Sequence, residues 1–110
     1  MKTTDKDFMR TIADIKDNTI TSLHLSDNYI DYKGAIAIAD ALKINNTITI
    51  FNLWDNKIGD EEAIAIADAL KINNTITRLY LSHNNIGDKG VIAIADAIKV
   101  NSINNRKVKY

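Results

Sequence analysis

The stretch AIAIADALKINNTIT occurs twice, at residues 35–49 and again at residues 63–77. An identical run of fifteen residues, repeated 28 positions later, is not expected by chance and is rarely needed by an active site. A fixed spacing between copies is typical of repeat architectures, in which each copy is one structural unit that stacks on its neighbours. The identical positions therefore predict a scaffold, and the positions that differ between copies are predicted to carry recognition.

The repeat extends beyond this stretch. Three copies follow one another without a gap, at residues 18–45, 46–73 and 74–101, and each begins with Asn-Thr-Ile-Thr. In the first half of each copy apolar and polar residues alternate, which is typical of a short strand, and in the second half apolar residues recur at helical spacing. Neither half can bury its apolar face alone, so the sequence predicts strand–helix units that share one core. The helix positions predicted to face this core are Ala35, Ile38, Ala39 and Leu42 and their equivalents in the later copies.

The strand half of each copy carries one motif. It reads Ile20-x-x-Leu23-x-Leu25-x-x-Asn28-x-Ile30 in the first copy and recurs from Ile48 to Ile58 and from Ile76 to Ile86. This motif resembles the leucine-rich repeat, and the 28-residue length with a full helix resembles the ribonuclease-inhibitor type, also found in NOD-like receptors. The resemblance implies an α/β solenoid, a short right-handed βα horseshoe segment with a parallel sheet on its concave side and helices on its convex side. It also implies a protein-binding role. One departure is Glu62, which stands where the other copies have glycine.

The segments that flank the repeats are predicted to cover the ends of the stack, because terminal repeats would otherwise expose their core. Phe8, Met9, Ile12 and Ile15 have helical spacing and predict a capping helix within residues 1–17. Residues 102–110 are predicted to form a cap strand or a tail, in which Arg106 takes the place of a core leucine. In such a strand, Lys107 and Lys109 would discourage pairing at a free edge.

The starts of the repeat helices carry acidic residues. Asp60 and Asp88 precede the apolar spacing of the second and third helices, and in the first copy Asp31 or Tyr32 stands there. A carboxylate at the N-cap accepts hydrogen bonds from main-chain N–H groups that have no partner within the helix. The sequence therefore predicts Asp60 and Asp88 as N-cap residues.

Composition excludes several classes of function. The chain has no cysteine, so it has no disulfide framework and no thiolate site, and its net charge of zero gives no general attraction to nucleic acid or membrane. The short basic tail with Arg106, Lys107 and Lys109 is typical of a solvated segment. Because the first residues are polar and no long apolar run follows, we expect no secretory signal, no membrane span and a cytoplasmic location.

Asparagines and histidines are the remaining candidates for chemistry. Asn28, Asn56 and Asn84 follow the predicted strands and are interpreted as a structural ladder, in which side-chain amides pair with main-chain groups of the turns. His24 and His83 lie in different columns and two strands apart, too far for shared metal ligation. Asp55 and His83 fall in the same column of neighbouring copies, which favours an ion pair, but no nucleophile completes a hydrolytic site. The sequence therefore predicts no catalytic residue, no metal and no cofactor.

The outward positions of the predicted sheet differ from copy to copy. Among them, an exposed tryptophan with arginine and tyrosine nearby has the composition of an interface hot spot. The sequence therefore favours a noncatalytic module that binds a protein or peptide on its concave sheet face, although Trp54 resting only on neighbouring side chains remains an alternative. The predicted binding residues are His24, Ile50, Asn52, Trp54, Asp55, Arg78, Tyr80 and His83.

Apolar residues also recur outside the core-facing arc of the helices. They form two columns, Ile36, Ile64 and Ile92, and Ile44, Ile72 and Val100. Contact between neighbouring helices is the simpler explanation, and self-association is the other. The alternative function is therefore a structural solenoid that assembles with itself as a homo-oligomer, or a fragment of a larger leucine-rich-repeat protein.

Overall fold

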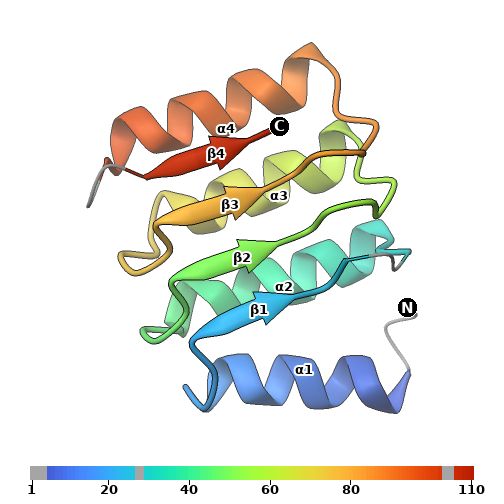
Figure 1. Cartoon of the computed structure of the whole chain (residues 1–110), viewed down its shortest axis with the longest axis vertical. Helices are drawn as coiled ribbons and strands as arrows, with labels where there is room; N and C mark the ends of the chain where they lie inside the picture. Colours follow the sequence, from blue (N-terminus) through green and yellow to red (C-terminus); the bar gives the residue numbers. More distant parts are fainter. Residues whose placement is uncertain (1–4, 27–28, 103–105) are drawn as a thin grey trace.

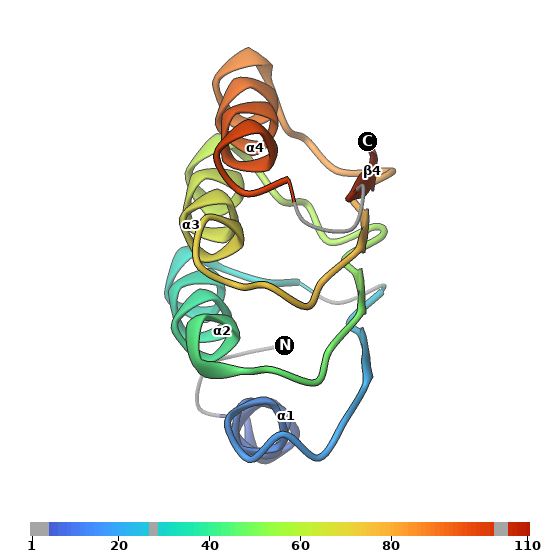
Figure 2. The same cartoon turned by 90° about the vertical axis from the view of Figure 1, so that its left-hand side faces the viewer.

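A computed structural model describes residues 5–26, 29–102 and 106–110. Helices and strands alternate along the chain, and the four strands pair in parallel in the order β1-β2-β3-β4. The helices form a second layer on one side of this sheet (Figures 1 and 2). The predicted α/β solenoid is therefore confirmed. The elements are α1 (Lys6–Lys16), β1 (Ser22–His24), α2 (Tyr32–Ile44), β2 (Ile50–Asn52), α3 (Asp60–Leu70), β3 (Arg78–Tyr80), α4 (Asp88–Val100) and β4 (Lys107–Lys109).

The core lies between the two layers. Leu23, Phe51 and Leu79 occupy equivalent places in adjacent strands and are buried. The predicted core-facing arc is buried throughout α2 and α3. In α4 only Ile94 of the same arc is fully buried, since among the described helices α4 has a neighbour on one side only. Each repeat therefore completes the core of the one before it.

The helix starts differ from the prediction. The N-cap residues are Asp31, Gly59 and Gly87, so the prediction of Asp60 and Asp88 as N-caps is wrong, and both are the first residues of their helices. Asp31, one of the two alternatives in the first copy, accepts a hydrogen bond from the Gly34 N–H at 2.7 Å. The carboxylates of the first turn still stabilise the positive end of the helix dipole.

Two carboxylates from the first turn of α3 accept hydrogen bonds from the main-chain N–H groups of the glycine N-caps. Glu62 Oε1 accepts the N–H of Gly59, its own N-cap, at 2.8 Å. Asp60 Oδ1 accepts the N–H groups of Gly87 and Gly90, at 2.7 and 2.9 Å, and so caps the helix of the following repeat. A Cβ on Gly90 would lie 2.8 Å from Asp60 Oδ1 and 2.6 Å from Ile86 Cγ2. Glycine is thus required where Asp60 approaches α4, whereas Glu62 at the equivalent place caps α3.

Asparagine side chains join the repeats after each strand. The Asn56 amide donates to the Leu25 carbonyl at 2.7 Å, and the Asn84 amide donates to the Leu53 carbonyl at 2.9 Å. Asn84 Oδ1 also accepts the main-chain N–H of Asn56 at 2.8 Å. Asn28, the first member of the predicted ladder, lies outside the described residues. Each amide thus donates to a main-chain carbonyl of the preceding repeat, so amide side chains join successive repeats.

A second set of asparagines, which the sequence analysis did not predict, joins the repeats after each helix. The Asn45 amide donates to the Ile15 carbonyl at 2.9 Å. The Asn73 amide donates to the Asn45 carbonyl at 3.2 Å, and the Asn101 amide donates to the Asn73 carbonyl at 3.0 Å. The first two strand–helix units are therefore each held, after the strand and after the helix, by amide side chains of the next unit.

At the start of the chain, α1 packs against α2. Phe8 and Ile15 are buried, whereas Met9 is 58% exposed and lies outside the buried face. This placement is compatible with a cap over the first repeat, but the division of the chain into residues 1–17, 18–101 and 102–110 stays a prediction.

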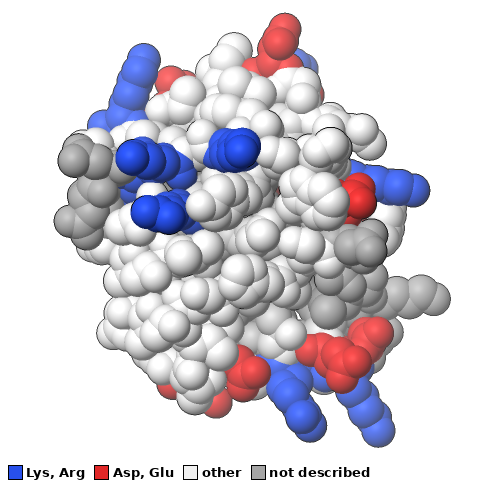
Figure 3. Space-filling view, viewed as in Figure 1, with Lys and Arg blue, Asp and Glu red and all other residues white. Residues whose placement is uncertain are grey.

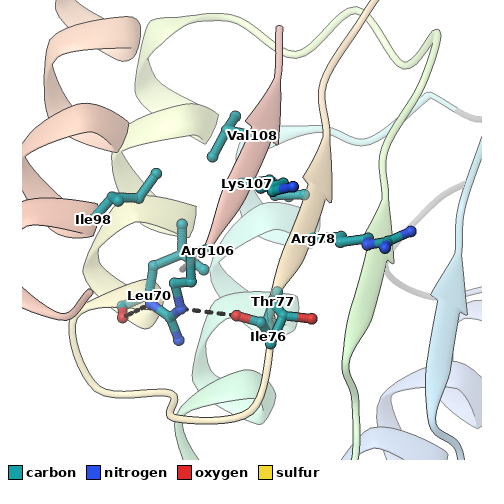
Figure 4. Close-up of a pocket in the computed structure, with 9 residues that line it drawn as sticks. Leu70, Ile76, Thr77, Arg78, Ile98, Arg106, Lys107 and Val108 are labelled. Atoms are coloured by element: carbon teal, nitrogen blue, oxygen red, sulfur yellow. Dashed lines mark hydrogen bonds between the residues drawn. The ribbon is translucent and has the colours of Figure 1, made fainter. Parts of the chain in front are cut away.

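At the other end, Arg106 does not replace a core leucine, and that prediction is wrong. β4 pairs so that Val108 lies opposite Leu79, two residues later than the motif alignment suggests. The Arg106 guanidinium donates to the carbonyls of Ile76 at 2.8 Å, Leu70 at 2.5 Å and Asn73. Figure 4 shows it turned towards Leu70 and Ile76. Burial lowers the pKa of Arg106, whereas these carbonyl acceptors favour the charged form. The physical reason for the two-residue change in register is that a guanidinium needs acceptors where it leaves water, and the end of α3 and the segment that follows it supply them.

Candidate interface on the sheet face

Side chains on the outward face of the sheet, the concave sheet face of the solenoid, form two rows across the strands. Adjacent strands lie about 4.8 Å apart, so neighbours in a row are close enough to contact one partner segment. Five predicted binding residues lie in these rows. From β1 to β4 the first row is Ser22, Ile50, Arg78 and Lys107, and the second row is His24, Asn52, Tyr80 and Lys109.

Trp54 lies in the turn that follows β2, beyond the two rows. Its indole meets the His83 ring edge to face, with ring centroids 5.1 Å apart and an angle of 77° between the planes. Asn52 Oδ1 accepts the main-chain N–H of Trp54 at 2.9 Å and holds the start of the turn. Trp54 therefore rests on a neighbouring side chain and still keeps 41% of its surface exposed.

Asp55 and His83 lie at equivalent places in two successive turns. Both have a positive φ of 60°, a conformation that Asp, Asn and His adopt more readily than most residues. The Asp55 N–H donates to the Ser82 carbonyl at 3.1 Å, which links the two turns. In the part of the chain that the structure describes, ion pairs join Lys43 to Asp40 and Lys71 to Asp68, and Asp55 and His83 form none.

Lys107 and Lys109 were missed as candidate binding residues. The sequence predicted a protective role for both lysines at the sheet edge, but the register places Lys107 beside Arg78 and Lys109 beside Tyr80. The Lys-Val-Lys alternation was the available signal, since it turns both lysines to one face. With Val108, these four residues line a hollow of about 270 Å³. Figure 3 shows the blue side chains gathered over β3 and β4, beside a central sheet face without charge.

Residues 5–26, 29–102 and 106–110 offer neither a candidate metal site nor a candidate membrane span. These residues contain no cluster of three or more His, Cys, Asp or Glu side chains placed to hold a metal ion. None of the described helices is both long and apolar enough to cross a bilayer.

Comparison with known families identifies the repeats. A family model described as "Leucine Rich repeat" matches three successive segments, residues 16–39, 45–67 and 73–95. The chain belongs to the leucine-rich repeat family. Each matched segment contains one strand and most of the helix that follows it, so the predicted resemblance to the leucine-rich repeat is confirmed for all three copies.

Two solved structures are similar to this leucine-rich repeat protein. One, described as leiomodin-1 actin-binding site 2, superimposes with a TM-score of 0.85 and 30% identity, over 96% of this chain and 61% of that one. The other is a tropomodulin C-terminal domain from Caenorhabditis elegans, with a TM-score of 0.72 and 13% identity over 94% of this chain, and it supports the fold alone. The leucine-rich repeat chain spans about 61% of the length of each structure. No curated protein matches it.

Proposed function

We propose that this leucine-rich repeat protein is a noncatalytic module that binds a protein or peptide on its concave sheet face. The observation that carries the proposal is Trp54, which keeps 41% of its surface exposed beside the outward rows of the sheet. Exposed aromatic residues are enriched among those that contribute most to binding energy at interfaces.

Two features of the sheet face support the proposal: its side chains differ between repeats, and hydrogen bonds hold its main chain in place. The inward positions of the strands are uniformly apolar, whereas the outward rows change from Ser22 to Ile50 to Arg78 within a single row. Asparagine side chains hold the main chain before and after both β1 and β2. A face that is ordered before binding loses little conformational entropy when a partner docks.

The similarity to the leiomodin-1 structure makes actin the first partner to test. That structure is described as an actin-binding site, and this chain matches it over 96% of its own length at 30% identity. We also propose that the repeats are of the ribonuclease-inhibitor type, on the basis of their 28-residue length. A cytoplasmic location is proposed from the lack of cysteine in the sequence.

Cosedimentation with filamentous actin, together with affinity capture from the native lysate, tests the proposal. Wild type would be compared with Trp54→Ala on the sheet side and with Ile64→Asp on the helix side. Loss of binding in Trp54→Ala and retention in Ile64→Asp is expected. The reverse result would move the binding site to the helices.

Self-association through the helices is a second candidate function. Ile44, Ile72 and Val100 form one apolar column, and their exposed fractions are 61%, 54% and 70%. Lateral contact between helices therefore leaves most of this column uncovered. Sedimentation velocity over a range of protein concentrations tests this alternative, which predicts a dimer or larger species that Ile72→Asp abolishes.

A further inference from the structure

We infer that Arg78, Tyr80, Lys107 and Lys109, here called the basic patch, bind an acidic peptide segment of the protein partner. The inference rests on the proposed function and adds the chemistry of the partner at one end of the same face. It is drawn from the geometry of β3 and β4, the lack of described carboxylates on that face, and the shape of the hollow there.

The register concentrates positive charge on the outward side of two strands. Arg78 pairs with Lys107, and Tyr80 pairs with Lys109, so the four side chains form a two-by-two grid. All three cations are exposed, whereas Val108 between the lysines is half-buried against the core. Like charges on directly opposed strand positions repel one another and destabilise the sheet. An anionic ligand would remove this cost.

No carboxylate in the described part of the chain neutralises the basic patch. Its described ion pairs lie on α2 and α3, and the two outward rows of the sheet contain no Asp or Glu. The whole chain nevertheless has equal numbers of acidic and basic residues, 14 of each. The patch is therefore a local separation of charge and does not reflect a generally basic protein.

The shape and extent of the patch favour an acidic peptide. Arginine presents a planar fork that matches a carboxylate with two parallel hydrogen bonds, and lysine adds a point charge. The Tyr80 ring and Val108 give the hollow, of about 270 Å³, an apolar part for the stem of a glutamate or for a neighbouring side chain. Nucleic acid is bound along extended basic stripes, but here the rows continue into neutral Ile50 and Asn52.

Fluorescence anisotropy with a labelled glutamate-rich peptide tests the inference, and the same peptide with glutamine in place of glutamate is its control. The double variant Lys107→Gln and Lys109→Gln is expected to bind the acidic peptide about tenfold more weakly. Lys89→Gln with Lys99→Gln removes the same charge from α4 and should leave affinity unchanged. Affinity of the wild type should also fall as salt is raised.

Three results would overturn the inference: equal binding of the glutamine peptide, equal loss in the α4 control, or tighter binding of a single-stranded oligonucleotide than of the acidic peptide. The peptide comparison uses wild-type protein and so holds even if a variant fails to fold. Partner capture distinguishes the two proposals. If Trp54→Ala no longer captures the partner but the lysine variant still does, only the acidic-peptide inference is overturned. If both variants still capture the partner, the sheet-face function is overturned as well.

Discussion

Asp60 Oδ1 accepts a hydrogen bond from the main-chain N–H of Gly90, 30 residues later, at 2.9 Å. The carboxylate belongs to the first turn of α3, and the N–H belongs to the first turn of α4. The start of one helix is therefore stabilised by a residue of the preceding repeat. Removing that residue should weaken the contact between two repeats and not only one helix.

Asp60→Ala is expected to lower the free energy of unfolding by about 1 kcal/mol, the usual cost of losing an N-cap acceptor. Urea unfolding followed by circular dichroism measures the effect. Asp88→Ala is the matched control, because Asp88 occupies the same place one repeat later and is exposed. Equal destabilisation by the two substitutions would mean that only the local helix dipole matters.

Asn56→Leu is expected to lower the free energy of unfolding by roughly 1–3 kcal/mol, because it removes a buried amide that donates to the carbonyls of Leu25 and Trp54. Asn56 is fully buried, whereas Asn85 is exposed, and Asn85→Leu serves as the control. A urea midpoint for Asn56→Leu that matches wild type would contradict a structural role for these amides.

Phe8→Asp is expected to lower the free energy of unfolding by on the order of 3 kcal/mol or more, because it places a carboxylate against the core. Met9→Asp changes the adjacent residue of α1, which is 58% exposed, and should have little effect. Thermal unfolding of the two variants compares them directly. If both melt like wild type, α1 is an appended helix and does not cap the first repeat.

Trp54→Ala is expected to weaken binding of the natural partner by on the order of 2 kcal/mol or more, with little change in stability. Stability should hold because the indole packs on His83 at the surface and not within the core. Isothermal titration calorimetry with the captured partner gives the affinity, and a thermal melt gives the stability. A variant that binds normally but melts early would make Trp54 a structural residue.

The layered fold could be predicted because its information is local and repeated. Leu23, Phe51 and Leu79 recur at one spacing, and a pattern seen three times predicts both the strand and its neighbour. The Asp60–Gly90 hydrogen bond could not be predicted in this way, since the first copy has Tyr32 at the place of Asp60.

The far end of the candidate interface was harder to predict for a related reason. Beyond residue 101 the repeat spacing no longer holds, so alignment to the earlier copies misplaces the last strand. The strand pairs where Val108 faces the core and the Arg106 guanidinium reaches main-chain carbonyls. This pairing of β4 with β3 brings Lys107 beside Arg78, and it is set by contacts between residues far apart in the sequence. The basic patch therefore depends on tertiary structure.

The second set of asparagines bears on how such a chain can change in length. Asn73 bonds the carbonyl of Asn45, and Asn101 bonds the carbonyl of Asn73, each across 28 residues. Donor and acceptor are both asparagine at these two junctions, so one repeat can follow another there without new bonding chemistry. Gain or loss of one repeat by unequal recombination would therefore keep the asparagine hydrogen bonds between repeats and alter only the width of the surface offered to a partner.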